Sequence, residues 1–272
     1  MTGIVGFSRK IRHVVACALG IVCYRAGRYD QAIQYSSHAI RLNREYGVAL
    51  ANRGGAYNRK KQYDHAIHDL DEAIRLNPRF ALALNYRGFA YNGKKQYDRA
   101  IQDLDEAIRL NPRLADAFNN RGYAYNGKQQ YDRAIRDLDE AIRLDPRFAD
   151  AFNGRGFAYN GKNQFDRAIQ DLNEAIHLDP RFASAFNNRA VAYNGKHQYD
   201  SAIQDLDKAI RLNPGYAAAY VNRGTALAAS GRRVQAEADF ARASQLSPVS
   251  PAVQEFQRNE FQPRGDTTRR GP

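Results

Sequence analysis

Residues 81–114 read ALALNYRGFAYNGKKQYDRAIQDLDEAIRLNPRL, and this stretch decides the fold of the chain. Closely related stretches precede and follow it, so that a proline returns every 34 residues. These prolines are Pro78, Pro112, Pro146, Pro180, Pro214 and Pro248. A constant period of this length is typical of a helix–turn–helix unit stacked many times, because one unit cannot bury its own apolar faces.

Each half of the unit is predicted to be a helix, since its apolar residues recur at spacings of three and four. Asn92 and Gly93 are expected to end the first helix, because glycine accepts the left-handed conformation found after a helix C-terminus. Asn111 and Pro112 are expected to end the second helix, because proline cannot continue the hydrogen-bond ladder.

Acidic residues are expected to support the second helix. Asp98 lies at its start, where a negative charge suits the positive end of the helix dipole. Asp105 and Arg109 are four residues apart with the acid first, which predicts a stabilising ion pair.

Small residues recur at fixed places and predict close helix packing. Gly88 and Ala107 return 34 residues later as Gly122 and Ala141, and Ala100 returns as Ala134. A larger side chain at these places would push neighbouring helices apart.

A known family has this signature. The residues that match it are Gly88, Tyr91, Ala100, Leu104, Ala107 and Pro112. The chain therefore resembles the tetratricopeptide repeat family. The resemblance implies an all-α fold, a right-handed superhelical solenoid of 34-residue helix–turn–helix repeats that binds proteins and needs no cofactor. One difference is that the family commonly has glycine two residues later in the turn between the helices.

The repeat frame divides the chain into four parts. Residues 1–12 are a basic N-terminal segment, and residues 13–46 are a degenerate first repeat. Six repeats fill residues 47–250. Residues 251–272 are predicted to form a short capping helix followed by a disordered basic tail.

The net charge of +12 is not uniform, and much of the excess lies at the N-terminus, where residues 1–46 hold seven Lys and Arg residues against two acids. Such a balance favours acidic partners of any kind. The apolar run within residues 9–23 fits a repeat helix and a cytoplasmic protein, while a targeting signal or membrane anchor is the alternative. It is too short to span a bilayer as a helix.

No catalytic or metal-binding pattern is found. Cys17 and Cys23 are expected to be buried free thiols, and His65 and His68 an exposed pair without a third ligand. The six histidines fall at different places in the repeat frame. We therefore expect no enzymatic activity and no metal or cofactor.

The resemblance implies that the first helix of each repeat lines a concave groove where a ligand binds. Asparagines and aromatics recur there, and a carboxamide can pair with a peptide N–H and C=O together. The pattern resembles the asparagine ladder of the O-linked N-acetylglucosamine transferase superhelices. The predicted peptide-binding residues are Asn52, Asn85, Phe89, Asn119, Asn120, Tyr123, Asn153, Phe157, Asn187, Asn188 and Asn222.

The asparagine columns need not reflect a ligand. In near-identical repeats any polar residue forms a column, and the asparagines that precede the glycine, such as Asn92, are interpreted as turn residues. The groove lacks the lysines of the carboxylate clamp found in heat-shock co-chaperones. The leading hypothesis is a scaffold for an extended protein segment, acidic or disordered in character. The alternatives are nucleic-acid binding through an arginine column and self-association through the array ends.

Overall fold

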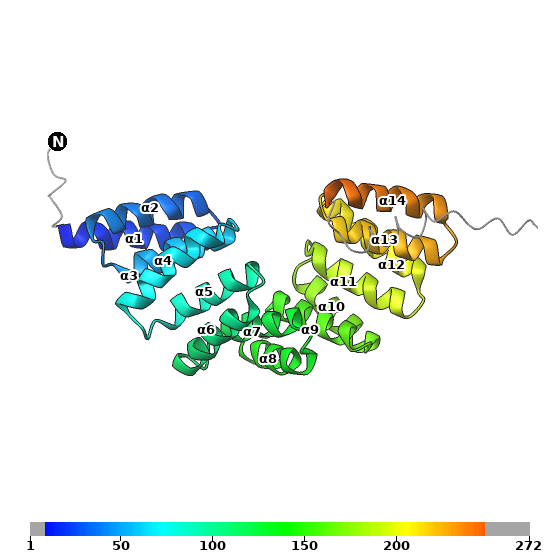
Figure 1. Cartoon of the computed structure of the whole chain (residues 1–272), viewed down its shortest axis with the longest axis horizontal. Helices are drawn as coiled ribbons and strands as arrows, with labels where there is room; N and C mark the ends of the chain where they lie inside the picture. The colour runs from blue at the N-terminus through cyan, green and yellow to red at the C-terminus, as the bar shows by residue number, and fades with distance from the viewer. Residues whose placement is uncertain (1–8, 248–272) are drawn as a thin grey trace, which may run out of the picture. The chain divides into compact units, whose positions relative to one another are not determined.

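The structure is a computed structural model that describes residues 9–247, and every regular element in this range is an α-helix (Figure 1). The helices are α1 (Arg9–Arg25), α2 (Tyr29–Leu42), α3 (Gly47–Arg59), α4 (Tyr63–Leu76), α5 (Ala81–Gly93), α6 (Tyr97–Leu110), α7 (Ala115–Gly127), α8 (Tyr131–Leu144), α9 (Ala149–Gly161), α10 (Phe165–Leu178), α11 (Ala183–Gly195), α12 (Tyr199–Leu212), α13 (Ala217–Ala229) and α14 (Arg233–Leu246). The fold is an all-α helical-repeat solenoid.

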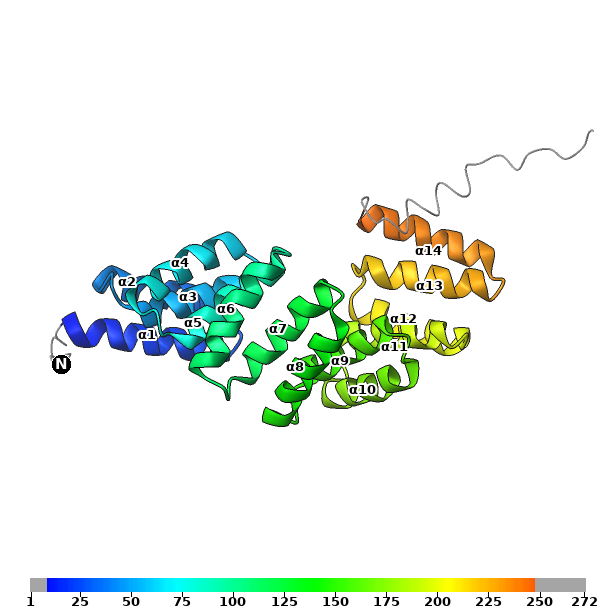
Figure 2. The same ribbon diagram turned by 60° about the horizontal axis from the view of Figure 1, so that its bottom comes forward.

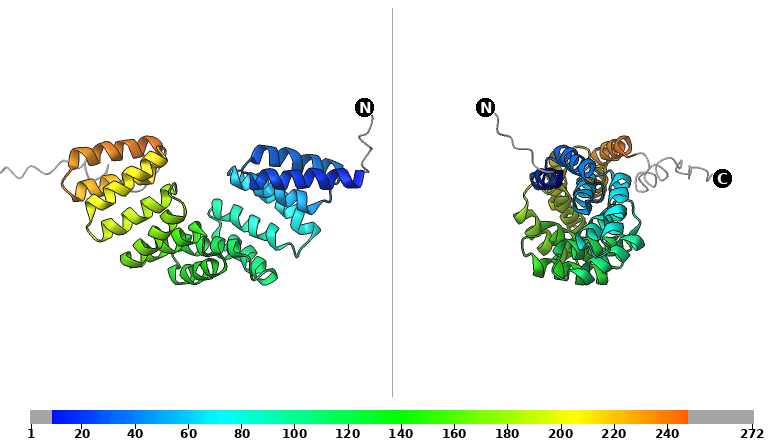
Figure 3. Two further views of the ribbon diagram at one scale, coloured as in Figure 1. Left: turned by 180° about the vertical axis from the view of Figure 1, so that it is seen from behind. Right: turned by 90° about the vertical axis from the view of Figure 1, so that its left-hand side faces the viewer.

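Two compact units make up the chain, residues 1–154 and residues 155–272. Within each unit, consecutive helices lie side by side, as the view from behind in Figure 3 also shows. In the second unit, α13 and α14 form the last helix pair of the described residues (Figure 2).

Odd-numbered helices also contact each other. In the first unit α1 contacts α3, α3 contacts α5, and α5 contacts α7, whereas no comparable contact joins the even-numbered helices in the described part of that unit. The first helices of successive repeats are therefore closer together than the second helices. We call the surface that they form within a unit its inner face.

The predicted packing of small residues is confirmed. A methyl group added to Gly88 would lie 2.7 Å from Cγ of Leu104, which is too close for a real contact. Leu104 is fully buried, as are Ala100 and Ala107. Gly122 meets Leu138 in the same way in the next repeat. Four repeats, those of Gly54, Gly88, Gly122 and Gly156, therefore close on a leucine that fits against a bare glycine backbone. In the last two described repeats, Ala190 takes the place of the glycine and Gly224 faces Phe240.

The first helix does end at Gly93, but the explanation from glycine conformation is wrong. The residue in the left-handed conformation is Lys95, with φ of 58°. Its neighbour Gln96 donates a hydrogen bond from N to the carbonyl of Tyr91, as in a Schellman motif. Gly93 instead leaves room for the ring of Tyr63 from the preceding repeat.

The family's usual glycine does occur in the outer repeats. Gly27 and Gly231 occupy the register position of Lys95, and both have positive φ. In the repeats between them this position holds Lys61, Lys95, Gln129, Asn163 and His197, all with positive φ. The backbone of the turn is thus the same whether or not glycine is present.

The acidic residue at the start of the second helix has a partner outside its helix. Asp98 lies in the first turn of α6 and forms an ion pair with Lys128 of the next repeat. The predicted pair of Asp105 with Arg109 is not formed. Arg109 pairs with Glu106 at 2.5 Å, and Asp105 pairs with Arg121 at 2.7 Å.

At the N-terminal end, α1 begins at Arg9, so the predicted boundary at residue 13 falls inside a helix. Cys17 and Cys23 are buried free thiols, and burial raises the pKa of the Cys17 thiol. The predicted capping helix and tail at 251–272 lie outside the described residues. Between residues 9 and 247 no helix has both the length and the apolar character needed to cross a membrane.

Candidate functional site

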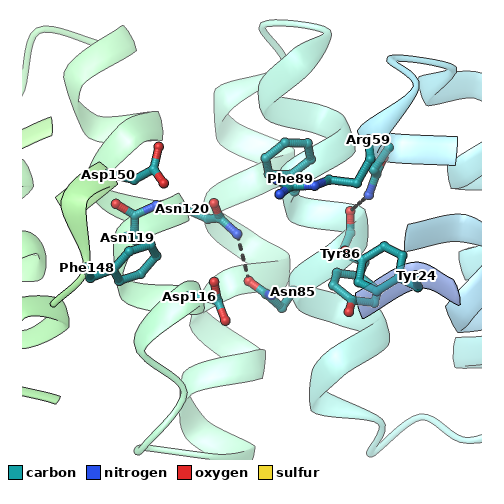
Figure 4. Close-up of a pocket in the computed structure, with 11 residues that line it drawn as sticks. Tyr24, Arg59, Asn85, Tyr86, Phe89, Asp116, Asn119, Asn120, Phe148 and Asp150 are labelled. Atoms are coloured by element: carbon teal, nitrogen blue, oxygen red, sulfur yellow. Dashed lines mark hydrogen bonds between the residues drawn. The ribbon is translucent and has the colours of Figure 1, made fainter. Parts of the chain in front are cut away.

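A pocket of about 320 Å³ opens on the inner face of the first unit (Figure 4). Helices α1, α3, α5 and α7 and the beginning of α9 contribute to it. The lining residues are Tyr24, Asn58, Arg59, Asn85, Tyr86, Phe89, Asp116, Asn119, Asn120, Phe148 and Asp150. We call this cavity the unit-1 pocket.

Several lining residues differ from their counterparts in the other repeats. Arg59 stands where the next repeats have Gly93 and Gly127. Tyr86 stands in the column of Asn52 and Asn120. The repeats are otherwise close copies. Packing gives side chains that differ between repeats no reason to lie in the same cavity, so we expect them to be scattered over the surface unless a ligand requires them together.

Two more differences lie in the same pocket. Tyr24 replaces an asparagine that is Asn58 in the second repeat. Asp116 replaces Leu82, and its counterpart in the following repeat is Asp150. The pocket thus gathers several side chains that recur in at most two repeats.

A glycine makes room for one of these side chains. A methyl group on Gly55 would lie 2.9 Å from the ring of Tyr86, whereas Phe89 and Tyr123 occupy the equivalent place in later repeats. The rings of Tyr24 and Tyr86 lie 6.1 Å apart, with their planes tilted by 53°. Burial raises the pKa of the Tyr86 phenol, so this hydroxyl stays protonated.

The charges of the pocket are two carboxylates and one guanidinium. Arg59 donates from Nε to the hydroxyl of Tyr29 at 3.3 Å. Asp116 lies at the pocket surface, and the removal of water by its surroundings raises the pKa of its carboxyl group. The positive charge of Arg59 offsets part of this effect. Figure 4 shows Arg59 extending from α3 into the pocket, with Asp116 and Asp150 coming from α7 and α9.

The predicted ladder asparagines bond to one another. Asn120 donates from Nδ2 to Oδ1 of Asn85 at 2.9 Å, and Asn222 donates to Asn187 at 2.8 Å. Asn85 and Asn187 are buried, with 2% and 5% of their surface exposed. Asn52 is also buried and donates to Oγ of Ser36 at 2.7 Å. These amides join neighbouring repeats.

The other predicted residues fall into two groups. In the first unit, the predicted residues that line the pocket are Asn85, Phe89, Asn119 and Asn120, and Tyr123 is 57% exposed on α7. Asn153 lies on α9. In the second unit Phe157 is exposed, and Asn188 accepts from Asn187 at 3.3 Å. The pocket therefore brings together only part of the predicted set.

The asparagine before the helix-ending glycine is a cross-repeat donor, so its interpretation as a turn residue is wrong. Asn92 donates from Nδ2 to the backbone carbonyl of Asn120 at 2.7 Å, and Asn58 donates to that of Tyr86 at 2.7 Å. The Oδ1 atoms of both side chains are buried and have no hydrogen-bond partner. In both bonds the carbonyl lies 28 residues after the asparagine, in the first helix of the next repeat, and this constant separation was the signal available in the sequence.

The arginine column is also engaged in packing. Arg121 binds both carboxylate oxygens of Asp137 at 2.7 Å and reaches Asp105 of the preceding repeat. Desolvation raises the pKa of Asp137 in spite of this partner. The same two-oxygen bond to an aspartate 16 residues later is formed by Arg53, Arg87, Arg155, Arg189 and Arg223. The column therefore no longer supports nucleic-acid binding.

No metal centre is found in the described part of the chain, where no three His, Cys, Asp or Glu residues come together in a suitable group. His65 and His68 are exposed on α4.

Comparisons with known proteins agree with this architecture. Models of the tetratricopeptide repeat match residues 15–46, 47–80, 70–102, 149–182 and 183–216, and a further model described as TPR repeat matches 93–129 and 122–162. The chain belongs to the tetratricopeptide repeat family. A search of curated proteins found no match to the sequence.

Solved structures share the fold at low sequence identity. A tetratricopeptide repeat protein from Parabacteroides merdae is 20% identical with a TM-score of 0.67, over 91% of this chain and 98% of that one. The APC/C hetero-tetramer Cut9–Hcn1 gives 16% identity and a TM-score of 0.76, over 92% of this chain and 53% of the other. PilW, a type IV pilus biogenesis factor, is 21% identical with a TM-score of 0.66, over 78% of this chain and 98% of that one.

Members of this family act as protein-interaction scaffolds and are in general not enzymes. The chain is a scaffold of this kind.

Proposed function

We propose that the chain binds an extended peptide segment of a partner protein on the inner face of its first unit, with the unit-1 pocket as the main contact. The observation that carries this proposal is the convergence of Tyr24, Arg59, Tyr86 and Asp116, each of which departs from the repeat pattern, on one cavity. Residues needed for stacking recur in every copy. Residues that occur in only one or two repeats and gather in a pocket are better explained by a ligand.

The lining suits a peptide. The amides of Asn119 and Asn120 both donate and accept, so they suit the N–H and C=O groups of an extended backbone. Phe89 and Phe148 add apolar contact area at low entropic cost. A volume of about 320 Å³ is at the small end for ligand pockets and suits one or two side chains rather than a folded domain.

Selection of random peptides displayed on phage, followed by fluorescence anisotropy with the selected peptides, tests the proposal. Phe89→Ala and Asn119→Ala are expected to weaken binding, each by about tenfold. Gln102→Ala, on the exposed side of α6, serves as the matched control and is expected to bind normally. Circular dichroism checks that all variants stay helical. Failure to select any peptide, or equal binding by the pocket variants, would contradict the proposal.

A second candidate is self-association through α1. Val15 and Val22 are exposed, although their counterparts Ala83 and Ala90 are fully buried under the preceding repeat. Ile11, Val14 and Leu19 extend this apolar stripe. Light scattering over a range of protein concentrations tests this candidate. A molar mass that rises with concentration in the wild type, but not in the double variant Val15→Ser/Val22→Ser, supports self-association. A constant monomer mass in the wild type would contradict it.

A further inference from the structure

The unit-1 pocket has more negative than positive charge, although the chain as a whole is strongly basic. Its charged side chains are Asp116, Asp150 and Arg59. Arg59 already donates to the hydroxyl of Tyr29, and its guanidinium carbon lies 6.0 Å from the centre of the Tyr29 ring. Arg59 extends from α3 into the cavity and interacts electrostatically with both carboxylates, which come from α7 and α9, so one positive group faces two negative groups (Figure 4).

We infer that the ligand of this pocket is a peptide segment with a cationic side chain, lysine or arginine, which Asp116 receives with Asp150 beside it. The inference rests on the proposed function and specifies its ligand. It replaces the expectation of an acidic partner, because an acidic side chain placed here would meet two carboxylates.

Asp116 is not needed for stacking. The same register position holds Val48 and Leu82 in the two preceding repeats, and Ser184 and Ala218 in the second unit. Asp116 is exposed at the pocket surface, and it lacks the two-oxygen arginine contact that Asp103 and Asp137 receive. A cationic ligand would supply the opposite charge that no arginine of the fold brings into direct contact with Asp116.

The neighbouring groups are also suited to a donor. Asn58 lines the pocket and is 3% exposed, and its Oδ1 atom has no hydrogen-bond partner. The equivalent Oδ1 atoms of Asn92 and Asn126 share this property, so the amide alone does not select a ligand. The rings of Phe89 and Phe148 provide apolar and π surface for the stem and head of a long cationic side chain.

The test is the composition of the peptides that phage selection returns. Selections on the wild type are compared with selections on Asp116→Asn, which keeps the shape and removes the charge, and on Asp150→Asn. Asp98→Asn is the matched control, because it removes the same charge from an exposed ion pair with Lys128. Anisotropy then compares a selected peptide with its analogue in which the basic residue is glutamine.

We expect enrichment of lysine or arginine with the wild type and with Asp98→Asn, and loss of that enrichment with Asp116→Asn. The glutamine analogue should bind about tenfold more weakly to the wild type and equally to Asp116→Asn. Enriched peptides without basic residues, or equal losses in Asp116→Asn and Asp98→Asn, would overturn the inference and leave peptide binding standing. Failure to enrich any peptide would instead overturn the proposed function.

Discussion

Arg87 and Asp103 are joined by two parallel hydrogen bonds of 2.7 Å, from Nε and Nη2 of the arginine to the two carboxylate oxygens. The remaining nitrogen, Nη1, reaches Asp71 in the preceding repeat at 2.7 Å. One side chain thus links both helices of its own repeat and the second helix of the repeat before it. The pair is largely buried, with 20% and 9% of the two side chains exposed.

Removing this arginine should be costly. Arg87→Met leaves the Asp103 carboxylate without its partner, and we expect a loss of about 3 kcal/mol in the free energy of unfolding. Urea denaturation followed by circular dichroism measures it, with the midpoint as the primary quantity because a repeat array need not unfold in two states. Arg109→Ala, which removes an exposed pair with Glu106, is the control and should leave the midpoint almost unchanged. Equal effects of the two changes would contradict this account.

The glycine that faces Leu104 should tolerate no side chain. Gly88→Ala places a methyl group 2.7 Å from Cγ of Leu104, so helix α5 or the leucine must shift, at a cost of about 2 kcal/mol. Gly215→Ala is a suitable control, since the added methyl would meet only Oδ1 of Asn213 at 3.5 Å. Thermal unfolding of both variants checks this, and an unchanged midpoint for Gly88→Ala would show that the helices are less tightly packed.

The turn between the two helices offers a stabilising change. Lys95 has φ of 58°, a conformation that costs a residue with a side chain about 1 kcal/mol relative to glycine. Lys95→Gly should therefore raise the melting temperature, although glycine also loses more freedom on folding. Asn163→Gly should gain less, because asparagine accepts this conformation more readily. A lower melting temperature for Lys95→Gly would mean that the lysine makes a contact worth more than the strain.

The carboxylate of the unit-1 pocket should destabilise the folded protein at neutral pH. The pKa of Asp116 is raised by desolvation, so the folded state favours the protonated form, and ionisation reduces stability as the pH rises through the folded pKa. Asp116→Asn should then melt at a slightly higher temperature than the wild type at pH 7, since the exposed carboxylate keeps part of its hydration, and the difference should shrink toward about pH 4. If Asp116→Asn is more stable than the wild type and binds the peptide more weakly, Asp116 serves ligand binding. If the variant is less stable at both pH 7 and pH 4, Asp116 has a structural role.

Much of the fold was predictable because it depends on local and repeated features. The recurring proline, the Gly88 position and the alanine columns set the helices and their packing, and the structure confirms them. The details of the turn were not predictable in the same way. The left-handed conformation expected at Gly93 belongs to Lys95, because a glycine that makes room for Tyr63 and a glycine with positive φ look identical in a sequence.

The candidate site was predictable only in outline. Phe89, Asn119 and Asn120 were expected on the groove and line the pocket. Arg59 and Tyr86 were not among the predicted site residues, although both break the repeat pattern visibly. Searching for residues that differ between repeats, rather than for columns that recur, would have found them.

The sequence by itself determined that the chain is a stack of helix pairs, because the apolar residues of both helices and the glycine and alanine residues between them all lie within one 34-residue repeat. Only the tertiary structure decided which polar residues are left for a ligand. Asn85 and Arg87 both belong to polar columns of the inner helices, yet one bonds to Asn120 and the other to Asp103. These partners come from other helices, 35 and 16 residues away, and their distances depend on how neighbouring helices stack.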